Sequence, residues 1–543
     1  MAILGWARLS LQAAEGTGYN LSASELAAGL ALMGHRVVYL SSGMRYSLVP
    51  GMRIVRTETW RGVECFDLIN SPNLSPSAAN FRNPLMESSS AKQSRLVVDF
   101  LRRHNADLVH SHSLEGQGLD LIGAIKDAGM GVVVTLHNYW HLCPQVDLLH
   151  DEHELCLDYD GGRRCEGCLS ADRPATKRLK RAVIRSIERI VGPKQTELFK
   201  HKSKRLMRRV RSIETNEVSE ASTRRVRLDP ELALGHTVSG VGDGTVDHGF
   251  APGDRTPRKP VRLHIDENER CVQARDVHLR VLNSYGRRRL AGVGALNRAD
   301  RVTPPSEFNA RLHEAMGVEA ERIQVVRYGQ PHFDQINRRA RRSPFYDRVP
   351  WEAASATRPL RFGFFGTVRP NKGLEVLLRA IEGLEPAVRR RCQFVIRASG
   401  GDWPMRRRMS KYPEVNFLGG YDLIQLIAAG GEYDVGILPH IWFDNSPLVM
   451  WEHLHAGKPV IAARLGGAAD TIKPIDTDPP GNGVFFAGGC PDELAERITQ
   501  FATGAIEIPT ARQIHEVSTL TTYPEHVREV DAIYQDILNC SKA

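Results

Sequence analysis

Residues 438–467 read L-P-H-I-W-F-D-N-S-P-L-V-M-W-E-H-L-H-A-G-K-P-V-I-A-A-R-L-G-G. The first residues end an apolar run of the kind that forms a buried parallel strand. Ser446 and Pro447 then predict a helix start, because Ser accepts from free backbone N–H groups and Pro is preset for the first helical position. Gly457 predicts the end of that helix, and residues 459–462 begin a second strand. The stretch therefore predicts a strand–helix–strand unit of an α/β sheet.

Two carboxylates flank the predicted helix start. Asp444 lies in the loop before the helix, and Glu452 lies eight residues later, inside it. The free N–H groups of a helix N-terminus attract anions, so a phosphate group could bind at the same place. The ordinary alternative is a helix with an acidic first turn and no ligand.

The same stretch closely resembles the nucleotide-binding signature of family-4 glycosyltransferases, which are retaining enzymes with the two-domain GT-B architecture. The family pattern is Glu-x7-Glu, then A-x-G-x-P-V-I-A and a Gly-Gly turn; here Asp444 replaces the first Glu. The resemblance covers roughly residues 1–170 and 295–540. It implies an α/β fold of two Rossmann-like domains facing a cleft, with an insertion in the N-terminal domain.

Composition agrees with more than one globular domain. A chain of 543 residues is too long for one core, and 42% hydrophobic with 25% charged residues is typical of a globular protein. No run reaches the ~18 apolar residues of a spanning helix. The first eight residues lack the basic and apolar regions of a signal peptide, so we expect a cytoplasmic location.

The net charge of +9 is concentrated in residues 171–211, which hold 15 Lys/Arg and three acidic residues. Such a segment could contact an anionic membrane from its inner face, bind nucleic acid, or form a solvated helical face. No aromatic residue precedes Phe199 in it and no nucleic-acid motif occurs. We therefore do not expect a nucleic-acid partner.

The N-terminus predicts a β-loop-α-β unit, with strands at residues 3–9 and 36–40. The loop contains Gly16 and Gly18. Most short glycine loops are tight turns, but the resemblance implies that this one faces the cleft near the nucleotide-sugar. By the same resemblance His137, in the segment T-x-H-N, contacts the donor sugar; the alternative is a structural histidine.

Four of the nine cysteines follow, with the spacing C-x12-C-x8-C-x2-C. They are Cys143, Cys156, Cys165 and Cys168. Four thiolates can hold a tetrahedral zinc ion, so we predict a structural metal site here. A disulfide pair and buried thiols are the alternatives. Some family-4 glycosyltransferases have a similar cysteine-rich insertion after an H-[D/N]-Y-W segment, and we place this chain in that subgroup by resemblance.

The remaining chain sets the domain boundaries. We assign residues 1–340 to the N-terminal acceptor-side domain, with the cysteine cluster at 143–168 and a basic, irregular insertion at 171–285. A proline-rich linker at 341–359 leads to the nucleotide-sugar domain at 360–507. Residues 508–543 are predicted to form helices that return toward the N-terminal domain.

The second domain opens with a strand, a glycine turn and a helix. The family segment G-R-L-x-x-x-K-G places an Arg and a Lys beside the diphosphate, and Lys372 matches the Lys. Thr367 occupies the Arg position, and Arg369 could replace that Arg. The resemblance implies that Glu452 binds the ribose and Asp444 the donor sugar. The remaining predicted nucleotide-sugar contacts are Asn445, Ser446 and the amides of Leu448 and Val449.

We therefore expect a retaining glycosyltransferase that moves a sugar from a UDP-, GDP- or ADP-linked donor to an acceptor hydroxyl. The acceptor would be a glycan, a lipid-linked molecule or a small molecule. We expect the enzyme to act in cell-surface polysaccharide or glycoconjugate synthesis. Catalysis should need no cofactor, and zinc at the cysteines would be structural. The alternatives are a GT-B nucleotide-sugar epimerase and a non-catalytic protein that binds anions or nucleic acid.

Overall fold

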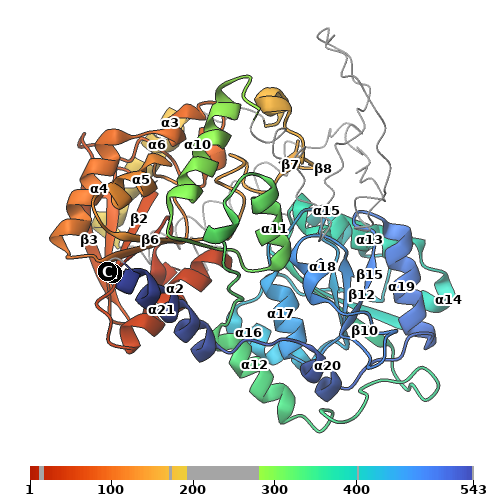
Figure 1. Ribbon diagram of the computed structural model, residues 1–543. Helices are drawn as coiled ribbons and strands as arrows, with labels where there is room; N and C mark the ends of the chain where they lie inside the picture. The colour runs from red at the N-terminus through yellow and green to blue at the C-terminus, as the bar shows by residue number, and fades with distance from the viewer. Residues whose placement is uncertain (12–17, 170–173, 193–279, 400–402, 541–543) are drawn as a thin grey trace, which may run out of the picture.

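The computed structural model describes residues 1–11, 18–169, 174–192, 280–399 and 403–540. Their main strands form two sheets, one of seven strands and one of six. Each sheet has helices around it, and the two units lie side by side (Figure 1). The predicted α/β fold with two Rossmann-like domains is confirmed.

The first sheet has the strand order β3-β4-β2-β1-β5-β6-β9. All neighbours pair in parallel except β3 and β4, an antiparallel edge pair that we did not predict. The strands are β1 (Ala2–Gly5), β2 (Val38–Arg45), β3 (Arg53–Trp60), β4 (Val63–Ile69), β5 (Leu108–Ser111), β6 (Gly131–Thr135) and β9 (Arg301–Thr303).

The helices of this part of the chain are α2 (Gly18–Leu32), α3 (Leu85–Ser88), α4 (Ala91–Arg103), α5 (Asp120–Asp127), α6 (Pro174–Val191), α10 (Ser284–Arg298), α11 (Glu307–Ala315) and α12 (Pro331–Arg341). A small hairpin, β7 (Leu149–His150) with β8 (Glu154–Leu155), follows β6 and precedes α6 in the sequence. Apolar side chains from alternate sides of the strands fill one core on each face of the sheet.

Two predicted strands are shorter than expected. The first ends at Gly5, and a 3₁₀ turn at Leu9–Leu11 takes up the rest of the predicted strand. The apolar residues Ile323, Val325 and Val326 favour a last strand of the domain at residues 323–329, but this segment forms only an isolated bridge between Val302 and Ile323. Its neighbour β9 has only three residues, so it offers too short a ladder for a full strand.

The second sheet has the order β12-β11-β10-β13-β14-β15, and all its pairs are parallel. Its strands are β10 (Leu360–Thr367), β11 (Cys392–Ser399), β12 (Val415–Phe417), β13 (Val435–Leu438), β14 (Val460–Ala463) and β15 (Gly483–Phe486). The helices are α13 (Leu374–Gly383), α14 (Pro386–Arg389), α15 (Trp403–Met409), α16 (Leu423–Ala428), α17 (Leu448–His455), α18 (Gly467–Thr471), α19 (Pro491–Thr503) and α20 (Ala511–Val517).

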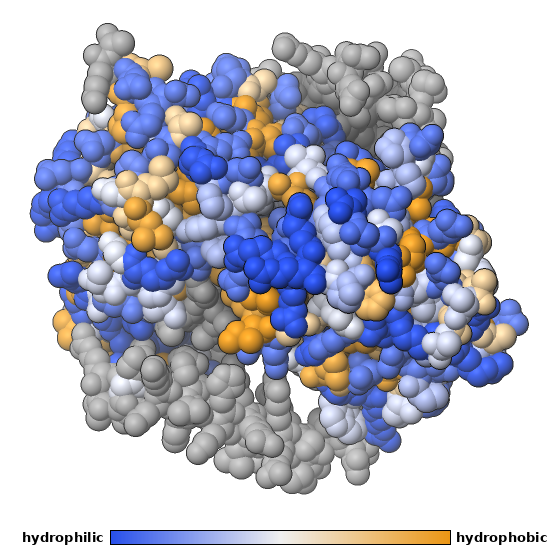
Figure 2. Space-filling view, turned by 90° about the horizontal axis from the view of Figure 1, so that it is seen from below, coloured by the Kyte–Doolittle hydropathy of each residue, from blue (hydrophilic) through white to orange (hydrophobic). Residues whose placement is uncertain are grey.

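The chain ends in α21 (Tyr523–Cys540), which lies against α2 and β6 of the first sheet (dark blue beside red in Figure 1). The Tyr523 hydroxyl donates to the Glu25 carbonyl at 2.7 Å, which fixes the start of α21 on α2. In the face shown in Figure 2, hydrophobic residues form small separate patches among hydrophilic ones. Within the described ranges, no helix has the length and apolar character needed to cross a membrane.

A buried ion pair holds α10 against the first domain. The Arg288 Nε atom lies 2.8 Å from Glu87 Oε2, and both side chains are fully buried. Asn80 donates to the other Glu87 oxygen at 3.0 Å, and the Arg288 guanidinium lies 4.9 Å from the centre of the Trp140 ring. The pair therefore joins α10, where the chain re-enters the domain, to α3.

Replacing Glu87 by Gln should lower the free energy of unfolding by about 3–5 kcal/mol, because Arg288 would keep a buried charge without its counter-ion. Asp127→Asn is the matched control, since Asp127 pairs with Arg298 of the same helix and both side chains are more than half exposed. The control substitution should lower the free energy of unfolding by less than about 1 kcal/mol. Urea unfolding measures both, and equal losses in the two variants would contradict the assignment.

Candidate functional site

The loop between β13 and α17 is fixed by the Gly466-Gly467 turn. The Gly467 amide donates to the Asp444 carbonyl at 2.8 Å. Gly466 has a φ of +60°, and a Cβ atom there would lie 2.3 Å from the Asp444 carbonyl oxygen. The two glycines thus allow the backbone of the 466–467 turn to touch the backbone at Asp444, which sets where that carboxylate sits.

Ser446 differs from its predicted role as a helix cap. The N-cap of α17 is Pro447, with no side-chain hydrogen bond to the helix amides. The Ser446 hydroxyl instead accepts from the Trp451 indole nitrogen at 2.8 Å, and both side chains are buried. Without this bond the indole N–H would be an unpaired buried donor. The Ser446 hydroxyl therefore accepts from the indole and not from the first amides of the helix. The amides of Leu448 and Val449 lie in the first helical turn, where N–H groups lack intrahelical partners.

Lys372 and Asp444 form an ion pair, with 2.7 Å between Nζ and Oδ2. The Asp444 residue is only 8% exposed, whereas the Lys372 side chain is 36% exposed. Lys372 ends a 3₁₀ turn, and a Cβ at the following Gly373, with a φ of +67°, would lie 1.6 Å from the Pro439 carbonyl oxygen. This contact places the Lys372 turn directly against the end of β13.

Glu452 is buried on α17 with one oxygen satisfied and one free. Its Oε1 atom lies 3.1 Å from His332 Nε2 on α12. Its Oε2 atom is buried and has no hydrogen-bond partner among the described residues. A buried carboxylate oxygen left unpaired is costly, so such an atom in a native site commonly accepts from a ligand.

The other predicted diphosphate residues lie at the end of β10. Thr367 is the last residue of β10, and its side chain is exposed. The Arg369 side chain is exposed as well. Burial raises the pKa of Asp147 in the first domain to about 7, and the charge of Arg369 is among the influences that oppose that rise.

The start of α2 meets the start of α17. A Cβ atom at Gly18 would lie 2.8 Å from a Leu448 methyl group, so these two predicted donor contacts, from opposite domains, touch. The other glycine of the predicted loop, Gly16, lies outside the described residues. The side chain of Val449 is half-buried beside Leu448 on α17.

Asn445 joins the two domains. Its side-chain amide donates to the Leu136 carbonyl, at the end of β6, at 2.9 Å. The Ser306 hydroxyl of the first domain donates to the Asn445 carbonyl at 2.6 Å, and Ser306 is also the N-cap of α11. The Oδ1 atom of Asn445 is buried and unpartnered within the described ranges. The loop before α17 is therefore in contact with the carboxyl end of the first sheet.

His137 belongs to a chain of hydrogen-bonded histidine and tyrosine side chains at that sheet edge. Its Nε2 atom lies 2.8 Å from His112 Nδ1, and its Nδ1 atom lies 2.8 Å from the Tyr328 hydroxyl. His110 contacts the Tyr534 hydroxyl of α21 at 2.6 Å, and its ring lies 4.3 Å from the His112 ring at an interplanar angle of 38°. Both ring nitrogens of His137 are thus engaged within the protein, so a donor-sugar contact would require it to exchange a partner.

Burial keeps these histidines neutral. It lowers the pKa of His110 and of His137 to about 3, that of His526 to about 4, and that of His112 well below its ordinary value. Neighbouring histidines add to the lowering of the pKa of His110, His112 and His137. Protonation of any one of them inside the folded protein is therefore disfavoured at neutral pH.

Stability should fall as the pH drops below about 6.5, because the unfolded chain then binds protons that the folded histidines refuse. Each such histidine contributes a slope of about 1.4 kcal/mol per pH unit until its own depressed pKa is reached. Above about pH 7 the slope from these groups should vanish. Urea unfolding at a series of pH values tests this, and His110→Gln should flatten the slope by about one histidine; an unchanged slope would contradict the expectation.

The four predicted metal ligands are free thiols close to one another. Burial raises the pKa of each, to about 11 for Cys156 and about 12 for Cys168, and the other cysteines of the group add to the shift of Cys165. Cys168 donates to Gln145 Oε1 at 3.0 Å. In the part of the chain that is described, no three or more His, Cys, Asp or Glu side chains are arranged around a common metal position. Four thiols that lie near one another are donors of the kind that zinc takes, although in this structure their side chains do not converge on one point.

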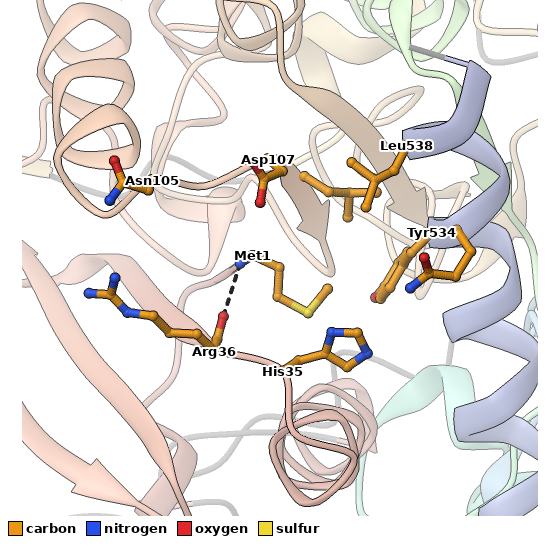
Figure 3. Close-up of a pocket in the computed structure, with 9 residues that line it drawn as sticks. Met1, His35, Arg36, Asn105, Asp107, Tyr534 and Leu538 are labelled. Carbon is orange, nitrogen blue, oxygen red and sulfur yellow. Dashed lines mark hydrogen bonds between the residues drawn. The ribbon is translucent and has the colours of Figure 1, made fainter. Parts of the chain in front are cut away.

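A separate cavity of about 300 Å³ lies at the opposite edge of the first sheet. Its lining includes Met1, Arg36 and Asp107, which precede three parallel strands, and Tyr534 and Leu538 of α21; Figure 3 shows the Arg36 side chain pointing away from that helix. Open parallel sheets bind their ligands at the carboxyl ends of the strands, and this cavity lies at the amino ends. None of the predicted site residues lines it, so it is distinct from the candidate site.

Three site residues were missed by the sequence analysis. His332 and Tyr328 contact Glu452 and His137, which are 120 and 191 residues away in the sequence, so no local pattern could reveal them. The Tyr139 hydroxyl is buried without a partner in the described chain, and after burial the charge of Asp444 contributes to raising its pKa. Tyr139 follows the T-x-H-N segment directly, which was a usable signal.

Two family models match the chain. A glycosyl transferase 4-like domain matches residues 17–198, and the model named glycosyl transferases group 1 matches residues 359–503. Each model falls on one of the two sheets, and the second contains Lys372, Asp444 and Glu452. No curated protein matches the sequence.

Solved structures resemble the whole chain at low identity. HepE of Anabaena, in complex with UDP, is 14% identical with a TM-score of 0.50, covering 98% of this chain and 99% of its own. Sucrose-phosphate synthase of Thermosynechococcus elongatus is 14% identical with a TM-score of 0.52, and 99% of each chain is covered. The UDP-forming α,α-trehalose-phosphate synthase of Burkholderia xenovorans, in complex with glucose-6-phosphate, is 11% identical with a TM-score of 0.51 and the same coverage. These likenesses show the shared two-domain fold.

Proposed function

We propose that this chain, a glycosyltransferase with the GT-B fold, binds its nucleotide-sugar at the start of α17 and transfers the sugar to an acceptor hydroxyl with retention of configuration. The observations that carry the proposal are the free, buried Oε2 atom of Glu452 on α17 and the Lys372–Asp444 ion pair, whose Asp444 lies in the loop before that helix. Glu452 would accept from the ribose hydroxyls, and its other oxygen is held in place by His332.

The reaction needs positive charge where the diphosphate leaves. Lys372 and the first-turn amides of α17 supply it, and their effect is largest in a closed, water-poor cleft. Without a donor, Lys372 is neutralised by Asp444. When the diphosphate binds, the ammonium group can bridge to it, and Asp444 becomes available to the hydroxyls of the sugar.

Retention would follow from attack by the acceptor hydroxyl on the face that the diphosphate leaves. The carboxylates already have assignments, Glu452 at the nucleotide and Asp444 at the sugar and Lys372, so we nominate no side-chain nucleophile. Asp444 is one methylene shorter than the family Glu, and this difference in reach should influence which sugar is accepted.

For the donor we propose a UDP-sugar first, because HepE binds UDP and UDP-glucose in the fold that this chain shares. GDP- and ADP-sugars are the alternatives. For the acceptor we propose a glycan, a lipid-linked molecule or a small molecule in cell-surface polysaccharide or glycoconjugate synthesis, at the cytoplasmic face of a membrane.

A thermal-shift comparison of UDP, GDP and ADP tests the site. A ligand that binds only the folded protein raises the unfolding temperature with its concentration, so one diphosphate should stabilise the protein in a saturable way. Release of that diphosphate from its sugar conjugate would then be followed with a panel of acceptors. Absence of stabilisation by all three diphosphates would contradict the proposal.

We also propose that the four cysteines hold a structural zinc ion. Support comes from their mutual proximity and from Arg289, whose guanidinium lies 3.6 Å from the Tyr159 ring centre and whose charge opposes the rise that burial causes in the pKa of Cys143 and Cys156. A cation at this place would help to balance the negative charge of four thiolates. Metal analysis of the purified protein should find about one zinc per chain; absence of any metal would refute this proposal without affecting the donor site.

A further inference from the structure

Helix α6 turns its basic side toward the protein. Arg181 donates to the Gly43 carbonyl at 2.6 Å and to the Ser75 carbonyl at 2.7 Å, and Arg178 donates to the Pro72 carbonyl. On the same side the buried Ala182 joins a small apolar cluster with Tyr46, Leu74 and Ala79. The helix is therefore attached by guanidinium groups that bind backbone oxygens.

Its apolar side faces outward. Leu179, Val183 and Ile187 are 59%, 45% and 41% exposed. They are spaced by four residues, so they lie on one face over successive turns of the helix. We call these three residues the outer stripe. A surface helix ordinarily buries its apolar face and exposes its charges, and α6 does the reverse.

The position of α6 explains the reversal. The carbonyl oxygens that receive Arg178 and Arg181 belong to the carboxyl-end region of β2 and to residues 72–75, just after β4. The Gly43 carbonyl already accepts from the Ser75 amide at 3.1 Å, and a carbonyl oxygen can accept a second hydrogen bond, which a guanidinium group supplies and an apolar side chain cannot. This edge of the sheet is also the edge that carries His112 and His137.

We infer that the outer stripe of α6 inserts into the surface of an anionic lipid bilayer. The helix has six Lys/Arg and one Glu, and Lys180 is exposed beside the stripe. A cationic helix with exposed Leu, Val and Ile lies in the membrane interface, with its apolar face in the acyl boundary and its charge beside anionic headgroups. The sequence predicted contact through charge; the structure points instead to contact through apolar side chains, with charge as an addition.

A second copy of the chain is a poorer occupant of the stripe. A stable protein interface buries about 1,200 Å² or more, which three partly exposed side chains cannot supply. Two copies of the same cationic helix would also repel each other, whereas an anionic bilayer attracts both. This inference does not depend on the proposed activity, because none of its residues belongs to the donor site.

Vesicle flotation of the full chain tests the inference. The protein should bind vesicles of phosphatidylcholine with phosphatidylglycerol more tightly than vesicles of phosphatidylcholine alone. The variant L179S/V183S/I187S should lose at least about tenfold in binding to the anionic vesicles, because the inserted apolar area is removed. The matched control is L423S/I424S on α16, two exposed apolar residues of the other domain, which should bind as the wild type does.

The unfolding temperature of each variant, with and without the stabilising nucleoside diphosphate, shows that fold and donor site are intact. Wild-type protein that does not float with anionic vesicles would overturn the inference, and so would a triple variant that floats normally. A triple variant that instead loses self-association, with no vesicle binding by the wild type, would assign the stripe to a second copy and would also overturn it.

Discussion

Replacing Lys372 by Met should lower kcat for sugar transfer by about 10²- to 10³-fold, an effect of about 3–4 kcal/mol on the activation free energy. The negative charge on the departing diphosphate grows in the transition state, and Lys372 is the cation that the structure holds beside the start of α17. Methionine keeps most of the stem and removes only the charge. The loss should therefore appear in kcat more than in KM.

Lys411→Met is the matched control for this experiment. Lys411 is an exposed cation of the same domain, near the Tyr412 ring and away from α17, so its loss should leave both kinetic constants unchanged. Asp444→Asn combined with Lys372→Met should be much less harmful than the sum of the two single changes, because each residue is the partner of the other. Near-normal turnover in Lys372→Met would refute the assigned role.

Replacing Glu452 by Gln should weaken binding of the nucleoside diphosphate by about 30- to 1,000-fold, or about 2–4 kcal/mol, because the ribose hydroxyls lose a charged acceptor in a buried site. The same change should leave the unfolding temperature without ligand unchanged or raised. The Oε2 atom has no partner in the described structure, so the folded protein gains little from its charge.

Asp434→Asn is the instructive contrast. Asp434 is also a fully buried carboxylate of the second domain, but it is bound by Arg358 at 2.6 Å and by Arg361 at 3.0 Å. Its removal should destabilise the protein by several kcal/mol and leave nucleotide affinity in the surviving folded protein unchanged. Isothermal titration and urea unfolding separate the two patterns. If Glu452→Gln behaved as Asp434→Asn does, Glu452 would be a structural residue.

The sequence allowed the fold and the second-domain site to be predicted because their signals are local. Asp444, Glu452 and the Gly466-Gly467 turn lie within 24 residues, and the structure places the glycine turn against the backbone of Asp444. The Lys372 turn was found by resemblance. Its direct pairing with Asp444 was not, because it depends on Gly373 meeting Pro439 across the sheet.

The parts that escaped prediction depend on long-range contacts. The hydrogen bond of Ser446 to Trp451 overrides a good capping sequence, since a buried indole N–H must be paired. His332 acquires its role only when α12 packs against α17, and Tyr328 only when its loop reaches the end of β6. The orientation of α6 could not be predicted from its periodicity. The pattern shows that the helix has a basic side and an apolar side, but not which of the two packs against the end of the sheet.

A crystal structure of the protein with the nucleoside diphosphate that stabilises it would test the central assignment most directly. The account predicts the diphosphate at the first turn of α17, within reach of Lys372, and the ribose hydroxyls on the free oxygen of Glu452. A nucleotide bound elsewhere, for example in the cavity between Asp107 and Tyr534, with Glu452 still unpartnered, would contradict it.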